Sequence, residues 1–126
     1  MSTWEVSVKG VLRREGRVLL ALNDRDEWEL PGGRLEADEN PHQALVREFE
    51  EESGLAVEPG ALLLVEPLEV IPGHRVLIVA YACEEGAVAG LRISAEHRDL
   101  AWFAPADLGA LRLPHVYRDA IGMGRR

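Results

Sequence analysis

Residues 32–55 have the sequence GGRLEADENPHQALVREFEEESGL, and this stretch determines which fold we expect for the chain. Its two leading glycines favour a tight turn. A helical segment follows with start and stop signals, because Asn40 suits the N-cap, Pro41 the first helical position and Gly54 the left-handed C-terminal position. The sequence therefore predicts a glycine turn followed by a helix over 41–53.

One face of this expected helix is acidic. At about 100° per residue, one arginine and three glutamates fall within roughly 140° of one another, namely Arg47, Glu48, Glu51 and Glu52. Leu45, Val46 and Phe49 fall on the opposite side, so we expect them to pack on the domain while the acidic face borders a cavity. Ala44 falls among the acidic residues and leaves space there.

Clustered carboxylates repel one another, and one arginine neutralises only part of their charge. No Cys or His accompanies the cluster. A hard divalent ion with oxygen ligands, Mg²⁺ or Mn²⁺, is therefore the natural complement. The alternative is an ordinary acidic helix face in contact with solvent.

The composition is that of one folded domain with an acidic balance. The chain has 126 residues, 47% apolar and 29% charged, so we expect a single domain over 1–126. Acidic residues outnumber basic ones 22 to 14, a formal net charge of −8. This charge argues against duplex nucleic acid as a partner. If the protein acts on a phosphorylated small molecule, a divalent cation is the usual means of offsetting the repulsion.

The termini and the cysteine content bear on location. Cys83 is the only cysteine and lies in an apolar run, so we expect a core residue rather than a nucleophile. Residues 1–10 lack a basic segment followed by an apolar one, and no apolar run approaches the roughly 18 residues that span a bilayer. We expect a cytoplasmic protein without a membrane partner.

The remaining sequence predicts strands and two short helices. Strands are expected over 6–12, 17–22, 28–30, 61–68, 75–83 and around 102–103, and helices over 105–111 and 114–122. The runs at 61–68 and 75–83 are apolar enough to be covered on both faces. Strands before, between and after helices indicate an α/β domain with a mixed sheet and helices on its faces.

Residues 33–55 resemble the Nudix box, G-x5-E-x7-R-E-U-x-E-E-x-G-U, in which U is aliphatic. The matching residues are Gly33, Glu39, Arg47, Glu48, Glu51, Glu52, Gly54 and Leu55, and Phe49 stands where an aliphatic residue is usual. So many specified positions at this spacing make chance agreement improbable. The resemblance implies the Nudix fold, an α/β/α sandwich with a mixed β-sheet.

The Nudix family cleaves nucleoside diphosphates linked to another moiety. The resemblance implies that Glu48, Glu51 and Glu52 hold or orient divalent metals, with the carbonyl of Gly32 as a further ligand. The expected activity is metal-dependent cleavage of a pyrophosphate linkage by water attack on phosphorus. Structural roles fall to four other residues of the box: Glu39 and Arg47 would pair and join loop to helix, and Gly33 and Gly54 would shape the two ends.

The general base varies in this family between the box helix and a later loop. Glu51 is the first candidate here. Glu96 lies where several members carry the later carboxylate, and it is equally an ordinary solvated acid. Asp99 is a further candidate.

The substrate class stays open among nucleoside triphosphates, nucleotide sugars and ADP-ribose. Pro72 is either the downstream proline of ADP-ribose hydrolases or part of a turn. Trp28 is expected to pack rather than to stack on a base. The alternative function is a non-catalytic nucleotide-binding or sensor domain. We expect a small-molecule nucleotide partner and a monomer or homodimer.

Overall fold

Strand β1 (Glu5–Arg14) lies at the centre of a mixed sheet in the computed structural model, which describes residues 4–86 and 99–123. β1 runs parallel to β6 (His74–Glu85) and antiparallel to its other partners. The sheet order is β3-β2-β1-β6-β5, with β4 paired to β1 and β7 paired to β2. The expected α/β fold with a mixed sheet is confirmed.

The remaining elements are β2 (Arg17–Leu22), β3 (Trp28–Glu29), β4 (Gly32–Arg34), α1 (Pro41–Ser53), β5 (Val57–Ile71), β7 (Asp99–Phe103), the 3-10 helix η1 (Pro105–Ala110) and α2 (His115–Met123). Most of them lie close to their expected positions, but Gly32 and Gly33, expected in a tight turn, lie in a strand, and β5 is longer than expected. The expected helix over 41–53 has the predicted bounds. The segment expected as a helix over 105–111 is a 3-10 helix that ends at Ala110.

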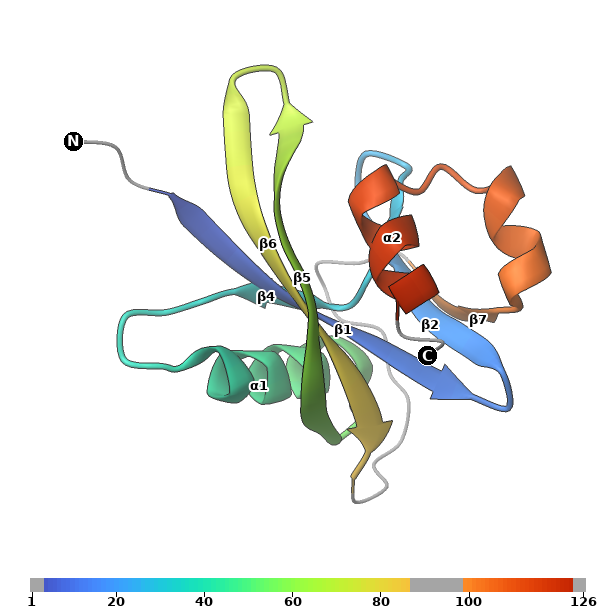
Figure 1. Cartoon of the computed structure of the whole chain (residues 1–126), viewed down its shortest axis with the longest axis horizontal. Coiled ribbons are helices and arrows are strands. Elements are labelled where there is room, and N and C mark those ends of the chain that lie inside the picture. Colours follow the sequence, from blue (N-terminus) through green and yellow to red (C-terminus); the bar gives the residue numbers. More distant parts are fainter. Residues whose placement is uncertain (1–3, 87–98, 124–126) are drawn as a thin grey trace.

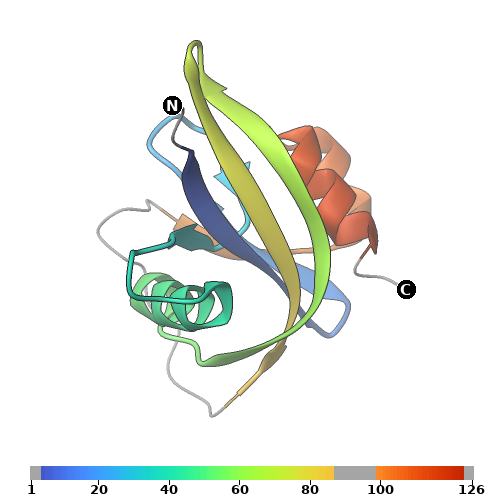
Figure 2. The same ribbon diagram turned by 60° about the vertical axis from the view of Figure 1, so that its left-hand side comes forward.

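Alternation along the strands separates two apolar layers, with α1 on one face of the sheet and α2 on the other (Figures 1 and 2). Val8 and Leu12 of β1 pack with Leu45 and Phe49 of α1. Val11, between them in sequence, belongs to the second cluster, which also includes residues of α2. Successive side chains of a strand point to opposite faces, so each face of β1 meets a different helix.

The sheet opens next to β1, and this opening positions the site. β1 pairs with β2 only near their shared turn, at Arg13 and Arg14. Farther along, residues 7–9 of β1 pair with β4 instead. Gly32 of β4 has a φ of 144°, and a Cβ atom there would overlap the Val8 carbonyl oxygen. Only glycine allows the two backbones this approach.

The expectation of strand 61–68 as covered on both faces is wrong. β5 extends well beyond that range and is an edge strand, paired only with β6. Leu62, Val65 and Ile71 are exposed. The tip of the β5–β6 hairpin projects past α1 and α2 (Figure 2). Apolar composition alone does not distinguish this edge position from a central one.

Two further expectations concern buried and membrane-spanning segments. Cys83 is buried against Gly10, and burial raises the pKa of its thiol to about 12, as suits a core residue. Within residues 4–86 and 99–123, no helix combines the length and apolar character required to cross a membrane.

We predict that Gly32→Ala destabilises the protein by about 3 kcal/mol or more, because the added methyl group forces β4 away from β1. Chemical denaturation of the wild type and the variant measures the loss. Gly109→Ala is the matched control, because a Cβ atom there meets nothing within 4 Å. It should change the free energy of unfolding by less than about 0.5 kcal/mol. Equal losses in both variants would contradict the close approach.

Candidate active site

Helix α1 has the capping that the sequence predicts. The Asn40 side chain accepts a hydrogen bond from the Gln43 backbone amide at 2.9 Å, and the Gln43 side chain accepts one from the Asn40 amide at 3.0 Å. Gly54 ends the helix with φ of 78°, a left-handed conformation. These two ends set the register of the acidic residues relative to the glycine turn.

Arg47 joins three parts of the site through its guanidinium group. Nε and Nη2 donate to the two carboxylate oxygens of Glu39 at 2.6 and 2.8 Å, so the expected pair is present and bidentate. Nη2 also donates to the carbonyl of Arg34 at 3.2 Å. Nη1 donates to Glu48 at 2.8 Å and to Glu51 at 3.4 Å. One side chain therefore links β4, the loop before α1 and the helix itself.

The three box glutamates of α1, which the sequence places on one acidic face, differ in their environment. The Glu51 side chain is 59% exposed, that of Glu48 is 14% exposed, and Glu52 is 2% exposed. Ala44, expected beside open space, is fully buried. The helix is rotated so that Glu51 faces solvent and Glu52 faces the protein interior. Of the three, only Glu52 lines the pocket described below.

The carboxylate of Glu48 lies directly against Gly33 of β4. A Cβ atom on Gly33 would overlap the carboxylate of Glu48. The glycine thus leaves the space that this carboxylate occupies beside the backbone of β4. Gly32 and Gly33 both line the pocket that Glu52 enters.

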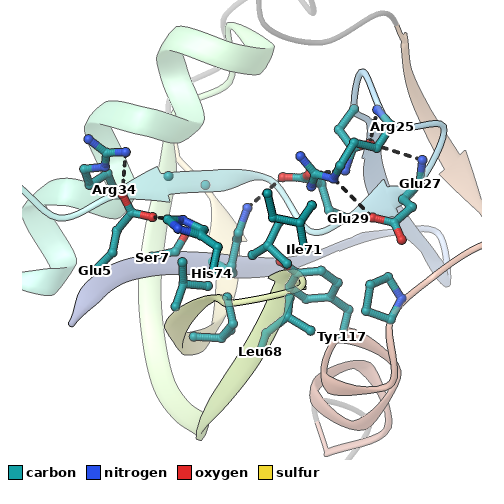
Figure 3. A pocket seen from close by; sticks show the side chains of 18 of the residues that line it. Glu5, Ser7, Arg25, Glu27, Glu29, Arg34, Leu68, Ile71, His74 and Tyr117 are labelled. Carbon is teal, nitrogen blue, oxygen red and sulfur yellow. Dashed lines mark hydrogen bonds and ion pairs between the residues drawn. The ribbon is translucent and has the colours of Figure 1, made fainter.

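The pocket has a volume of about 640 Å³, within the range typical of small-molecule sites. It takes side chains from both layers, including Glu52 of α1 and Tyr117 of α2. The end of the β5–β6 hairpin forms another wall with Ile71 and His74 (Figure 3). At the rim, Glu5 pairs with both Arg34 and His74.

Sequence reasoning missed a charged cluster inside this pocket. Lys9 is 4% exposed, and its Nζ lies 2.9 Å from Oε2 of Glu29. Burial by itself lowers the pKa of Lys9, but interactions with Tyr117, Glu29 and Glu52 outweigh it and raise the pKa above its ordinary value. A lysine between Val8 and Gly10, in a strand whose neighbours are apolar, was the available signal.

The donor set at α1 and β4 suits a hard cation. Glu48, Glu51, Glu52 and the backbone of Gly32 offer only oxygen atoms, which Mg²⁺ and Mn²⁺ prefer. Oε2 of Glu52 is shielded from solvent. In the described residues, no three acidic, histidine or cysteine side chains are grouped closely enough to hold a metal as they stand. Glu48 and Glu51 turn toward Arg47 instead.

The other residues singled out from the sequence lie as follows. Glu96 falls outside the described residues. Asp99 is exposed at the start of β7, where Oδ1 accepts the backbone N–H of Leu100, and it does not line the pocket. Trp28 packs edge-on against Phe103 with ring centroids 4.7 Å apart and also borders the pocket.

We predict that the Glu39–Arg47 pair stabilises the protein at neutral pH and stops doing so in acid. The Arg47 guanidinium beside Glu39 holds the pKa of that carboxyl below its ordinary value of 4.5. Stability from the pair is therefore complete above that value and is lost as the pH falls through the lower folded-state pKa. The difference in unfolding free energy between wild type and Glu39→Gln should narrow between neutral pH and about pH 3.

Asp38→Asn serves as the control for this measurement, because Asp38 is an exposed acid of the same loop. We expect its difference from the wild type to be smaller at neutral pH. A Glu39→Gln deficit that stays constant down to about pH 3 would contradict the role of the ion pair.

Comparison with known proteins places this site in a family. The model of the NUDIX domain matches residues 1–121. A MutT-like protein of Streptomyces ambofaciens is 36% identical over 89% of this chain and 71% of its own length. The CTP pyrophosphohydrolase of Escherichia coli K12 is 32% identical over 85% of this chain and 79% of its own length.

Solved structures agree with this assignment. The crystal structure of a MutT NUDIX hydrolase from Burkholderia pseudomallei superposes with a TM-score of 0.84 at 30% identity, covering 97% of this chain and 98% of that one. The Nudix box that the sequence displays lies on the loop and helix described above. The chain belongs to the Nudix hydrolase family.

Proposed function

We propose that this protein is a divalent-metal-dependent hydrolase that cleaves the pyrophosphate linkage of a small nucleotide by water attack on phosphorus. The observation that carries the proposal is the entry of Glu52 into the pocket beside Gly32 and Gly33, at the end of a complete Nudix box. A concave site with convergent polar groups of this kind suits a substrate of nucleotide size.

Glu48, Glu51 and Glu52 are proposed to hold the metal, with the Gly32 carbonyl as a further ligand. Bound there, Mg²⁺ or Mn²⁺ would neutralise pyrophosphate oxygens and lower the pKa of a coordinated water. Arg47 has a different part in the proposal. It holds Glu48 and Glu51 on the helix surface until the cation competes for them, and it keeps the Glu39 loop in place.

Glu51 is the proposed general base. Its side chain is the most exposed of the three, so it can reach a water molecule at the mouth of the site. Its 3.4 Å contact with Arg47 is the longest that the guanidinium makes to a box glutamate, which favours release. Glu96 remains the alternative base from the later loop.

The proposed partner is a small nucleotide of the triphosphate, nucleotide-sugar or ADP-ribose class. The relative from Escherichia coli is named for action on CTP, which makes nucleoside triphosphates the first class to test. The net charge of −8 supports a metal-carried substrate rather than duplex nucleic acid. A cytoplasmic location and a monomeric or homodimeric state complete the proposal.

We predict hydrolysis of at least one nucleotide only when Mg²⁺ or Mn²⁺ is present. The panel comprises ribonucleoside and deoxyribonucleoside triphosphates, ADP-ribose and a UDP-sugar, and chromatography detects monophosphate products. Chelation should abolish turnover, because the uncompensated glutamates repel the substrate phosphates. Turnover without metal would contradict the metal role, and binding of a nucleotide without any product would indicate the sensor alternative.

We predict that Glu52→Gln lowers kcat by a factor of about 100 or more. Substituting a residue that only hydrogen-bonds to a metal ligand already lowers metal affinity or activity by about 10- to 100-fold. The amide keeps the shape of the side chain but removes the charge that attracts the cation. Binding of Mn²⁺, followed by electron paramagnetic resonance, should weaken in parallel.

Glu50→Gln is the matched control, because Glu50 is an exposed glutamate of the same helix outside the specified positions of the box. It should retain wild-type kcat and Mn²⁺ affinity. If Glu52→Gln behaved like this control, the helix would not be the metal platform.

A further inference from the structure

Lys9 is the only lysine in the chain. The other cations that line the pocket, among them Arg25 and Arg34, are exposed, whereas Lys9 is buried at the centre of β1. Removing an ammonium group from water costs several kcal/mol unless carboxylates compensate it. Its location therefore requires partners inside the protein.

The first partner is Glu29 of β3, twenty residues away in sequence. Lys9 Nζ donates to Oε2 of Glu29 at 2.9 Å, and Asn23 Nδ2 donates to Oε1 at 2.7 Å. Asn23 is itself fixed, because its Oδ1 accepts the backbone N–H groups of Arg25 and Glu27 at 2.9 and 3.1 Å. Both oxygens of Glu29 are thus held in one orientation on the pocket wall.

The second partner lies on the other side of the opening beside β1. Lys9 interacts electrostatically with Glu52, which comes from α1 and is almost fully buried. Its ammonium group also lies 5.7 Å from the ring centroid of Tyr117, on α2. Figure 3 shows Glu29 and Tyr117 in the same pocket. Lys9 thus pairs with a carboxylate of β3 and carries a buried positive charge in a pocket that a carboxylate of α1 also lines.

We propose that Lys9 is a positioning residue of this site, which fixes the Glu29 carboxylate in the pocket wall and supplies a buried positive charge to the pocket that Glu52 also lines. Without the ammonium group, the half-buried carboxylate of Glu29 and the buried one of Glu52 would line the same pocket without a buried cation and repel each other. The inference extends the proposed function, on which its kinetic consequences rest.

The single lysine permits a direct test that needs neither metal nor substrate. Protein labelled with ¹⁵N-lysine contains one side-chain ammonium group, which we expect to give an NMR signal in slow exchange with water, because it is buried and hydrogen-bonded. Glu29→Gln should broaden or remove this signal, and Glu52→Gln should shift it. Glu50→Gln, the control on the same helix, should leave it unchanged. A signal that is insensitive to both Glu29→Gln and Glu52→Gln would overturn the proposal.

Measurements of KM then distinguish a positioning role of Lys9 from a role in stabilising the fold alone. On the most active nucleotide of the panel, Lys9→Met should raise KM about tenfold or more, as expected when a charged contact is lost. Glu29→Gln should do the same, and the double variant should be no worse than either single variant, because the two side chains act as one unit. Arg17→Met, which removes an exposed cation from β2, should keep the wild-type KM.

A Lys9→Met protein with a lower melting temperature and an unchanged KM would overturn the positioning role. If no nucleotide were hydrolysed, the proposed function would fail, while the NMR measurement on wild type, Glu29→Gln and Glu52→Gln would still decide the role of Lys9. A Lys9→Met chain that does not fold leaves the decision to that same measurement.

Discussion

The guanidinium group of Arg47 is the interaction on which the arrangement of the site depends. It donates hydrogen bonds to both carboxylate oxygens of Glu39, to a backbone carbonyl of β4 and to two glutamates of its own helix. Besides this guanidinium, the cap at Asn40 and the packing of Leu35 connect the loop to the helix. A rigid bidentate donor is suited to this because it sets direction as well as distance. Strand β4 and the acidic helix are therefore joined through one side chain.

The backbone of β4 supplies the second constraint. Gly32 and Gly33 let one short strand touch β1 on one side and the carboxylate of Glu48 on the other. This contact fills the place that β2 vacates when it diverges from β1. The opening that results admits Glu52 to the pocket. Beside this backbone contact, Glu52 of α1 and Tyr117 of α2 line one pocket, although the two helices lie on opposite faces of the sheet.

The charges of the site are balanced in two separate places. On the outer side, Arg47 is shared among Glu39, Glu48 and Glu51 near solvent. On the inner side, Lys9 faces Glu29 and Glu52 in buried surroundings. The physical demands differ, because screening by water moderates the outer cluster and not the inner one. The planar guanidinium of Arg47 donates to several carboxylates in the outer cluster, and the compact ammonium group of Lys9 provides the positive charge of the inner one.

The sequence by itself determined the helix, its caps and the family of the chain, because these depend on neighbours within a few residues and on a motif of fixed spacing. The resemblance to the Nudix box also implied the pair of Glu39 and Arg47, which the structure contains. Only the tertiary structure decided that β5 is an exposed edge, that Glu52 is buried while Glu51 is not, and that Lys9 pairs with Glu29 in the pocket that Glu52 lines. Those outcomes depend on how β1, β3, β4 and α1 pack across twenty or more residues, and no local pattern records how far a helix is rotated or which strand lies at an edge.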